Sequence, residues 1–395
     1  MPIFQPELET LPRPELERLQ RERLRERFGV ELEALAEQPF RVKSDLRDAY
    51  PFGLLRVPLQ DCVRIHASSG TQGKATIVAY TRADLAAWAD CCARALAAAG
   101  AGPGTVVHNA YGYGLFTGGL GLHYGAERLG CTVVPASGGH TPRQAQLLED
   151  LGAEILCCTP SYALAIADHV SEPARLKLRA GLFGAEPWTE GLREAIEGAL
   201  DLTAVDIYGL SEVMGPGVSA ECAEGRDGAH VNEDHFLVEA VDPQSGEPVP
   251  DGEVGELVFT TLTKEALPLL RYRTGDLAAL TRKPCACGRT FARMSRVLGR
   301  TDDMLIIRGV NVFPSEIERA LLAIPELEPH YQLVVERPGH LDELTVQVEG
   351  AGDPAAVSRQ LRSVLGLTAR VHVVPPGSIP RSEGKALRVL DRRTA

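Results

Sequence analysis

The chain has 395 residues, which favours two or more domains because one hydrophobic core usually serves about 100 to 200 residues. Its 41 lysines and arginines against 53 acidic residues give a net charge of −12, which opposes binding to nucleic-acid phosphates and anionic membranes. The sequence has no apolar run long enough to cross a bilayer, and its first residues lack the apolar core of a signal peptide. We therefore expect a multidomain cytoplasmic protein with neither nucleic acid nor membrane as a partner.

The first 45 residues have the pattern of a charged amphipathic helix followed by a connector, and residues 60–210 then alternate short β-branched runs with amphipathic segments. Thr81 and Asp84 have the spacing of a capping box at the start of the first predicted helix. Strands that alternate with helices predict a parallel sheet covered by helices. Strands are predicted at 61–68, 105–110, 131–137, 153–160, 178–184 and 202–209, and helices at 81–100, 141–152 and 187–200.

Two further regions follow. Residues 230–300 alternate strands with proline and glycine turns, which predicts antiparallel structure that forms a small β-barrel. Residues 301–395 predict a separate α+β domain, in which Ser315 and Glu318 have capping-box spacing. The predicted fold is therefore α/β, with a large N-terminal domain of helix-covered sheets plus the barrel, residues 1–300, and a small C-terminal domain, residues 301–395.

A polar loop follows the predicted strand at 61–68. A Walker-type phosphate loop needs four residues between its glycines and a hydroxyl after its lysine. Here only two residues stand between Gly70 and Gly73, and Ala75 follows the lysine. The alternative to an anion-binding loop is an ordinary polar hairpin turn. The candidate anion ligands are hydroxyls, glycine amides and one ammonium, from Ser68, Ser69, Gly70, Thr71, Gly73 and Lys74.

Six motifs occur in a fixed order: SSGTQGK, FGAEPWTE, YGLSEVMGPG, LPLLRYRTGDL, GRTDDMLIIRGVNVFPSEIE and IPRSEGKALRVLDRR. Together they resemble the adenylate-forming superfamily of acyl-CoA synthetases, adenylation domains and luciferases, and most closely the phenylacetate-CoA ligase family. The resemblance runs from about residue 44 to the C-terminus. It implies that the C-terminal domain is a mobile lid, with Asp302 at its hinge.

The resemblance also assigns site residues. Glu212 corresponds to the magnesium ligand and Lys385 to the lysine that bridges the attacking carboxylate and the α-phosphate. Asp276 and Arg300 correspond to ribose contacts, and Tyr208 offers a flat ring to the adenine. The alternatives are a solvated loop acid for Glu212, a helix-cap or turn aspartate for Asp276, and a solvated lysine for Lys385. The other implied nucleotide contacts are Ala185, Glu186, Pro187, Gly209 and Ser211.

The segment 109–130 resembles the acid-pocket helix of the family, with Tyr111 and Phe116 beside an aryl ring. Small residues at 184 and 185 leave room for a flat ring, and an apolar wall favours its burial. We therefore expect an aryl acid with a short spacer or none, such as phenylacetate or benzoate. The alternative is that Phe116 is a core residue. The rest of the pocket is assigned to Gly184, Ala185, Ile207 and Pro216.

Three functions fit these motifs. The first is a ligase that uses ATP and Mg²⁺ to form an acyl-adenylate and then passes the acyl group to coenzyme A, releasing AMP and pyrophosphate. The second keeps the adenylation but loads the acid onto a carrier protein or an amine. The third is a catalytically silent nucleotide-binding protein, against which Lys385, Glu212 and Asp276 argue because folding needs none of them. A homodimer is possible from the sequence.

Four residues that commonly bind metals lie outside the motifs. Cys285 and Cys287 stand in a polar CxCG turn, and Cys222 and His230 lie in the loop after Glu212. Thiolates with one imidazole suit tetrahedral zinc, and both loops leave the predicted nucleotide site. We expect a closed structural zinc site with no part in the chemistry. The alternative is a pair of free thiols and a histidine at the end of a strand.

Overall fold

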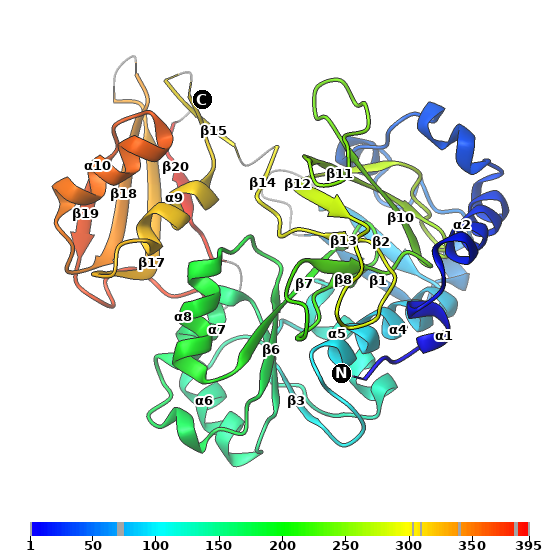
Figure 1. The fold of residues 1–395 in the computed structure, drawn as a ribbon, viewed down its shortest axis with the longest axis horizontal. Coiled ribbons are helices and arrows are strands. Elements are labelled where there is room, and N and C mark those ends of the chain that lie inside the picture. Colours follow the sequence, from blue (N-terminus) through cyan, green and yellow to red (C-terminus); the bar gives the residue numbers. More distant parts are fainter. Residues whose placement is uncertain are drawn as a thin grey trace.

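The chain folds around one large mixed sheet, with a smaller domain formed by its C-terminal part (Figure 1). This computed structural model describes residues 2–68, 75–301, 304–308, 310–338, 341–382 and 386–393, and of Asn311 only the backbone. In this part of the chain no helix is long and apolar enough to cross a membrane. The predicted α/β class is confirmed.

The N-terminal segment lies against the outside of the sheet, at the blue end of the ribbon (Figure 1). Two ion pairs hold it there: a buried one, in which Arg289 Nε lies 2.6 Å from Glu9 Oε2, and a partly exposed one, in which Arg13 pairs with Glu233 at 2.8 Å. The segment consists of α1 (Pro6–Glu9), α2 (Arg13–Phe28), α3 (Lys43–Asp48) and two short 3-10 helices, Leu32–Glu37 and Leu59–Asp61.

Parallel strands alternate with helices between residues 106 and 210, as predicted. The first predicted strand, 61–68, is not part of this parallel sheet, because Arg64–Ala67 pairs antiparallel with Ile77–Tyr80. Thr81 caps the helix that begins at Arg82 and forms the expected capping box with Asp84. The strand order β7-β6-β5-β3-β4 is parallel throughout. The elements are α4 (Arg82–Ala98), β3 (Val106–Asn109), α5 (Gly118–Leu129), β4 (Thr132–Val134), α6 (Thr141–Asp150), β5 (Ile155–Cys158), α7 (Pro160–Ala167), a 3-10 turn (Pro173–Arg175), β6 (Ala180–Gly184), α8 (Glu190–Leu200) and β7 (Thr203–Leu210).

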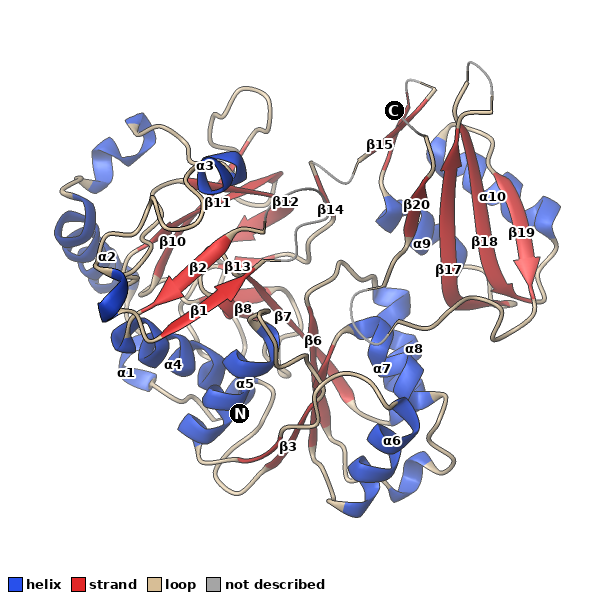
Figure 2. Cartoon of the chain, turned by 180° about the vertical axis from the view of Figure 1, so that it is seen from behind, coloured by secondary structure: helices blue, strands red, loops and turns tan. Residues whose placement is uncertain are grey.

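Helices cover both faces of these parallel strands, with α4 and α5 on one side and α6, α7 and α8 on the other (Figure 2). Strand β5 shows how one apolar run serves both layers, since successive side chains point to opposite faces. Ile155 and Cys157 belong to the core that includes α4 and α5. Leu156 and Cys158 belong to the core that includes α7 and α8.

The predicted antiparallel region is present and continues the parallel sheet. Its strands follow β7 in the order β8-β9-β13-β12-β11-β10, and β14 pairs with β12. Together with the parallel strands they form one sheet of 12 described strands, and closure into a small barrel is not shown. The hairpin of β1 (Arg64–Ala67) and β2 (Ile77–Tyr80) stands apart as a two-stranded sheet. The antiparallel strands are β8 (Gly215–Ala220), β9 (Ala229–Val231), β10 (Phe236–Val241), β11 (Val254–Thr261), β12 (Tyr272–Thr281), β13 (Arg293–Met294) and β14 (Gly299–Arg300).

The C-terminal part has its own hydrophobic core, which includes Ile317, Leu333 and Leu361. Its sheet has the order β19-β18-β17-β20, and β15 and β16 form a separate hairpin. The boundary between residues 300 and 301 stays a prediction, and Asp302 lies outside the described residues. The elements are β15 (Leu305–Ile307), β16 (Val310–Val312), α9 (Pro314–Leu322), β17 (Leu327–Glu336), β18 (Glu343–Gly350), α10 (Pro354–Leu365), β19 (Arg370–Val374) and β20 (Val389–Asp391).

The predicted capping box of Ser315 and Glu318 is wrong. Helix α9 begins after Phe313, which makes no side-chain cap. Ser315 Oγ instead donates to the carbonyl of Leu298, and Glu318 Oε1 accepts from the backbone N–H of Thr189 at 3.1 Å. Both side chains therefore join the C-terminal part to the large sheet region.

Candidate active site

The predicted phosphate loop joins β1 to β2. Ser68 N donates to Thr76 O at 2.9 Å, which closes the base of the loop. The hydroxyls of these two residues are buried and find no hydrogen-bond partner in the described part of the chain. Buried hydroxyls of this kind suit a ligand with many acceptor oxygens, such as a phosphate chain. The other loop residues assigned from the sequence, Ser69, Gly70, Thr71, Gly73 and Lys74, lie outside the described residues.

Glu212 is buried in the turn between β7 and β8. Lys43, in the first turn of α3, forms an ion pair with Glu212, with Nζ 3.2 Å from Oε1. The geometry of this contact is not that of a hydrogen bond, so Oε1 accepts no hydrogen bond from the described residues. The carboxylate therefore faces a cation while keeping an oxygen free to accept, which suits a magnesium ligand. Ser211 Oγ lies 3.1 Å from Thr117 Oγ1 at the start of α5. Gly209 approaches Gly215 so closely that a Cβ there would lie 1.8 Å from the carbonyl oxygen of Gly215.

Asp276, Tyr208 and Arg300 form one hydrogen-bonded group. Tyr208 donates its hydroxyl to Asp276 Oδ2 at 2.7 Å, and Arg300 Nη1 donates to Asp276 Oδ1. Burial and the nearby Asp276 carboxylate raise the pKa of the Tyr208 hydroxyl well above its usual range. The sequence-based assignment placed all three at the nucleoside. The structure brings them together, while the ribose and adenine contacts themselves stay predictions.

The segment 184–187 lies at the carboxyl end of β6. Ala185 has a φ of +72°, a left-handed conformation that a side chain rarely adopts outside functional sites. Glu186 accepts at Oε1 from the backbone N–H of Ser161 at 2.7 Å, and at Oε2 from that of Ala386 at 2.9 Å. Lys385 lies outside the described residues, but its neighbour Ala386 is thus bound to the predicted nucleotide segment. Pro187 follows Glu186 in the turn that leads to α8.

The residues assigned to the acid pocket are only partly brought together. Gly184 pairs with Ile207 in adjacent strands, and a Cβ at 184 would lie 1.9 Å from the carbonyl oxygen of Ile207. Tyr111 is buried, which raises the pKa of its hydroxyl, and this hydroxyl has no hydrogen-bond partner among the described residues. Pro216 accepts from the Trp88 indole at 2.9 Å. Phe116 is 55% exposed, so it is not a core residue.

Two family models and several known proteins match this chain. Residues 56–262 match the AMP-binding enzyme family, and residues 309–393 match the AMP-binding enzyme C-terminal domain. The phenylacetate-coenzyme A ligase of Thermus thermophilus is 52% identical over 444 residues, covering 99% of this chain and all of that protein. The phenylacetate-coenzyme A ligase of Escherichia coli is 53% identical over 380 residues, covering 92% of this chain and 86% of that protein.

The chain belongs to the phenylacetate-CoA ligase family. The resemblance stated from the six motifs is thereby confirmed.

The domain arrangement of this family member is similar to one state of a solved acyl-CoA ligase. The 2-hydroxyisobutyryl-CoA ligase in its post-adenylation state matches with a TM-score of 0.89 at 30% identity, covering 98% of this chain and 92% of that one. The same ligase in its thioesterification state matches with a TM-score of 0.71. The contact between Glu186 and Ala386 therefore belongs to an arrangement close to the post-adenylation state.

The four residues assigned to zinc meet in this ligase-family chain. Their ligand atoms, from Cys222, His230, Cys285 and Cys287, all lie within 4.8 Å of one another. Cys222 Sγ and Cys285 Sγ are 3.6 Å apart, and Cys287 Sγ is 3.3 Å from His230 Nε2. Two sulfurs in a tetrahedral zinc site lie roughly 3.7 Å apart when the bonds are about 2.3 Å. The donor set thus fits zinc, and the ion itself stays a prediction.

Three residues at the site had no sequence signal that marked them. Lys43 lies before the six motifs, Thr76 follows the phosphate loop, and Lys264 is a buried ammonium beneath Glu212.

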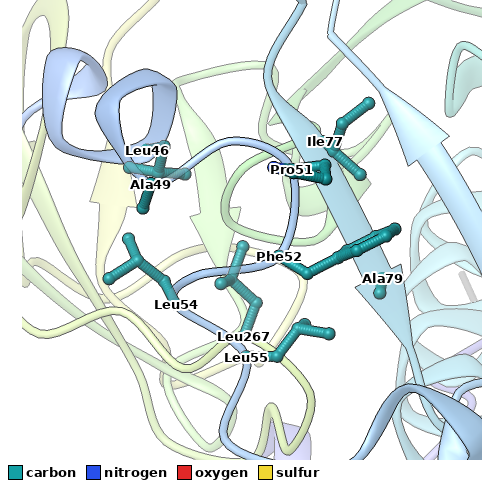
Figure 3. A pocket seen from close by; sticks show the side chains of 9 residues that line it. All are labelled: Leu46, Ala49, Pro51, Phe52, Leu54, Leu55, Ile77, Ala79 and Leu267. Atoms are coloured by element: carbon teal, nitrogen blue, oxygen red, sulfur yellow. The ribbon is translucent and has the colours of Figure 1, made fainter.

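A pocket lies near β2 (Figure 3), and none of the predicted site residues lines it. Its apolar lining comes from Leu46, Ala49, Pro51, Phe52, Leu54, Leu55, Ile77, Ala79 and Leu267.

Proposed function

We propose that this chain is an ATP-dependent ligase that joins phenylacetate, or an aryl acid of similar size, to coenzyme A. The observation that carries the proposal is the 52% identity to a phenylacetate-coenzyme A ligase over that protein's whole length. Activation of an acid with ATP and thioester formation with coenzyme A is the reaction class of the family. The identity of the acid is a more specific proposal, which rests on the names of the relatives and on the pocket residues.

The first half-reaction brings together two anions, the carboxylate and the nucleotide, so the protein must supply positive charge and alignment. A carboxylate oxygen attacks the α-phosphorus, and the bond to the departing pyrophosphate breaks. Magnesium held by Glu212 would supply positive charge beside the phosphate oxygens. The hydroxyls of Ser68 and Thr76 can donate to those oxygens, and we assign Lys385 to the attacking carboxylate and the α-phosphate.

The second half-reaction uses the same site. The coenzyme A sulfur attacks the acyl carbon, and the bond to AMP breaks, so AMP leaves with a carboxylate oxygen of the acid. Asp276 and Arg300 are proposed to hold the ribose through both steps, because their charge-assisted pairing fixes both side chains. Asp302 is proposed as the hinge about which the C-terminal part turns between the two steps.

The acid pocket is proposed to have an apolar wall of Tyr111 and Ile207. Gly184 lets β6 approach the backbone of Ile207 closely beside this wall, since a Cβ there would meet the Ile207 carbonyl oxygen and not an open space. Phe116 is proposed at its entrance, where an exposed ring can cover the bound acid. We propose coenzyme A as the acceptor rather than a carrier protein, because four curated relatives at 51% to 53% identity carry the name of a coenzyme A ligase. A cytoplasmic location and a homodimer stay predictions.

A panel of acids tests this function. We expect AMP release with phenylacetate, or with another aryl acid of similar size, to exceed that with a long-chain fatty acid by about 100-fold in kcat/KM, because a short pocket cannot bury a long chain. The measurement is AMP formation with and without coenzyme A. A preference for long-chain acids would overturn the pocket assignment. AMP release that needs an added carrier protein would favour the loading function instead.

We also propose a structural zinc ion at Cys222, His230, Cys285 and Cys287. Elemental analysis of chelator-washed protein should give about one equivalent of zinc. Cys285→Ser is expected to remove most of the zinc and to lower the unfolding temperature by several degrees, because the zinc turn leads directly to Arg289 and its buried pair with Glu9. Cys62→Ser, outside the cluster, is the matched control. Less than about half an equivalent of zinc, with unchanged stability in Cys285→Ser, would reject the site.

A further inference from the structure

Lys264 is a fully buried ammonium directly beneath the turn that carries Glu212. Its relative exposure is 0%, and its Nζ donates to the carbonyl oxygens of Glu212 at 2.9 Å and Val213 at 3.0 Å. Within the described residues it forms no ion pair with a carboxylate. Burial lowers the pKa of the Lys264 ammonium to about 8, and Asp84 and Glu212 oppose this shift.

Burying a charge without a carboxylate partner disfavours folding. An ammonium loses its hydration when buried, and two carbonyl oxygens replace it only in part. An apolar side chain of similar length, such as methionine, fills the same volume without that cost. Packing alone therefore does not explain a lysine at position 264, but the atoms that its ammonium contacts do.

Lys264 and Tyr80 together bind every backbone carbonyl of the turn 211–214. The single hydroxyl proton of Tyr80 is donated to the carbonyl oxygen of Met214 at 2.8 Å and shared with that of Ser211 at 3.3 Å. The Lys264 ammonium lies 4.9 Å from the centre of the Tyr80 ring, so the two side chains also hold each other through a cation–π contact. Four consecutive carbonyls are thus fixed from one side, which orients the Glu212 side chain.

The backbone around Lys264 is itself anchored to the start of α4. Asp84 accepts from the backbone N–H of Glu265 at 2.6 Å and from that of Ala266 at 3.1 Å. Thr81 Oγ1 donates to Glu265 Oε2 at 2.7 Å. Tyr80 ends β2, the strand that leaves the phosphate loop. A continuous set of buried contacts therefore connects the exit of the phosphate loop to the turn of Glu212.

We infer that Lys264 is a positioning residue, which holds the turn 211–214 so that the Glu212 carboxylate meets the magnesium ion of the bound nucleotide. The inference rests on the proposed role of Glu212. It assigns Lys264 to the adenylation step alone, because the second half-reaction starts from an adenylate and has no triphosphate to hold.

Lys264→Met tests the inference in the full chain. The magnesium concentration for half-maximal adenylation is expected to rise by about 10-fold or more, with kcat at saturating magnesium within about 3-fold of the parent. Thioester formation from purified acyl-adenylate is expected to stay within about 2-fold, since that step needs no triphosphate. Lys177→Met, on the surface, is the matched control and should change neither value.

A purely structural role for Lys264 would lower both half-reactions equally and leave the magnesium dependence unchanged, and that result would overturn the inference. Glu212→Gln, measured in parallel, separates the two assignments. If the half-maximal magnesium concentration is unchanged in Glu212→Gln, the proposed role of Glu212 is wrong. If it rises in Glu212→Gln but not in Lys264→Met, only the role of Lys264 is rejected.

If Lys264→Met does not fold, Tyr80→Phe tests the inference with the same measurements, because it removes the other donor to this turn. A rise of about 3-fold in the half-maximal magnesium concentration supports the inference, and no rise overturns it.

Discussion

Replacing Lys385 by alanine is expected to slow adenylate formation by about 100- to 1,000-fold, because the attacking carboxylate and the α-phosphate then lose the ammonium that we assign to both. Thioester formation from purified acyl-adenylate is expected to fall by less than about 10-fold, since the two anions have already been joined. The measurement is the single-turnover rate of each half-reaction. The described chain beside Lys385 supports the assignment, because Ala386 is bound to Glu186 in the post-adenylation-like arrangement.

The control for Lys385→Ala is Lys177→Ala, which removes an exposed ammonium before the amino end of β6, whereas residues 184–187 follow its carboxyl end. It should leave both rates unchanged. An equal loss of both half-reactions in Lys385→Ala would contradict a role confined to adenylation. A loss of thioester formation alone would place Lys385 in the other step.

Asp276→Asn is expected to raise the KM for ATP by about 10- to 100-fold, because an amide offers one acceptor where the carboxylate offers two. In the structure both carboxylate oxygens already accept, one from Tyr208 and one from Arg300. The neutral side chain cannot satisfy these donors and bind the ribose as well. The measurement is the dependence of AMP formation on ATP concentration at saturating acid.

Two further variants sharpen the result for Asp276. Asp251→Asn removes an exposed carboxylate that pairs with Arg282 on the surface, and it should leave the KM for ATP unchanged. Tyr208→Phe keeps the ring and removes only the donor to Asp276, so we expect a smaller rise in KM. A KM for ATP in Asp276→Asn equal to that of the parent would reject the ribose assignment.

The features that the sequence predicted well are those that local pattern determines. Strand β5 was predictable because its ILCC run has the apolar continuity of a strand buried on both faces. The capping box of Thr81 and Asp84 was predictable because both partners lie within one turn of the same helix. The order of the antiparallel strands was not predictable, since β9 pairs on one side with its sequence neighbour β8 and on the other with the distant β13.

The features that the sequence missed depend on partners far along the chain. Ser315 and Glu318 have the spacing of a cap, yet their partners Leu298 and Thr189 belong to the large sheet region. Lys264 stands in a polar stretch, where a lysine is normally solvated, and only the packing of the turn 211–214 over it reveals its burial. The cluster of four side chains that commonly bind metals, which includes Cys222 and Cys285, was predictable in part. Donor chemistry suggested it, but the fold alone brings Cys222 within 3.6 Å of Cys285.

Transfer of oxygen from the acid to AMP tests the central claim most directly. With phenylacetate labelled by ¹⁸O in its carboxyl group, ATP and coenzyme A, attack of the carboxylate on the α-phosphorus leaves one labelled oxygen in AMP and none in pyrophosphate. Mass spectrometry of the AMP formed in a single turnover should therefore show one added label for each thioester made. Unlabelled AMP, or label in a phosphate product other than AMP, would contradict activation through an acyl-adenylate.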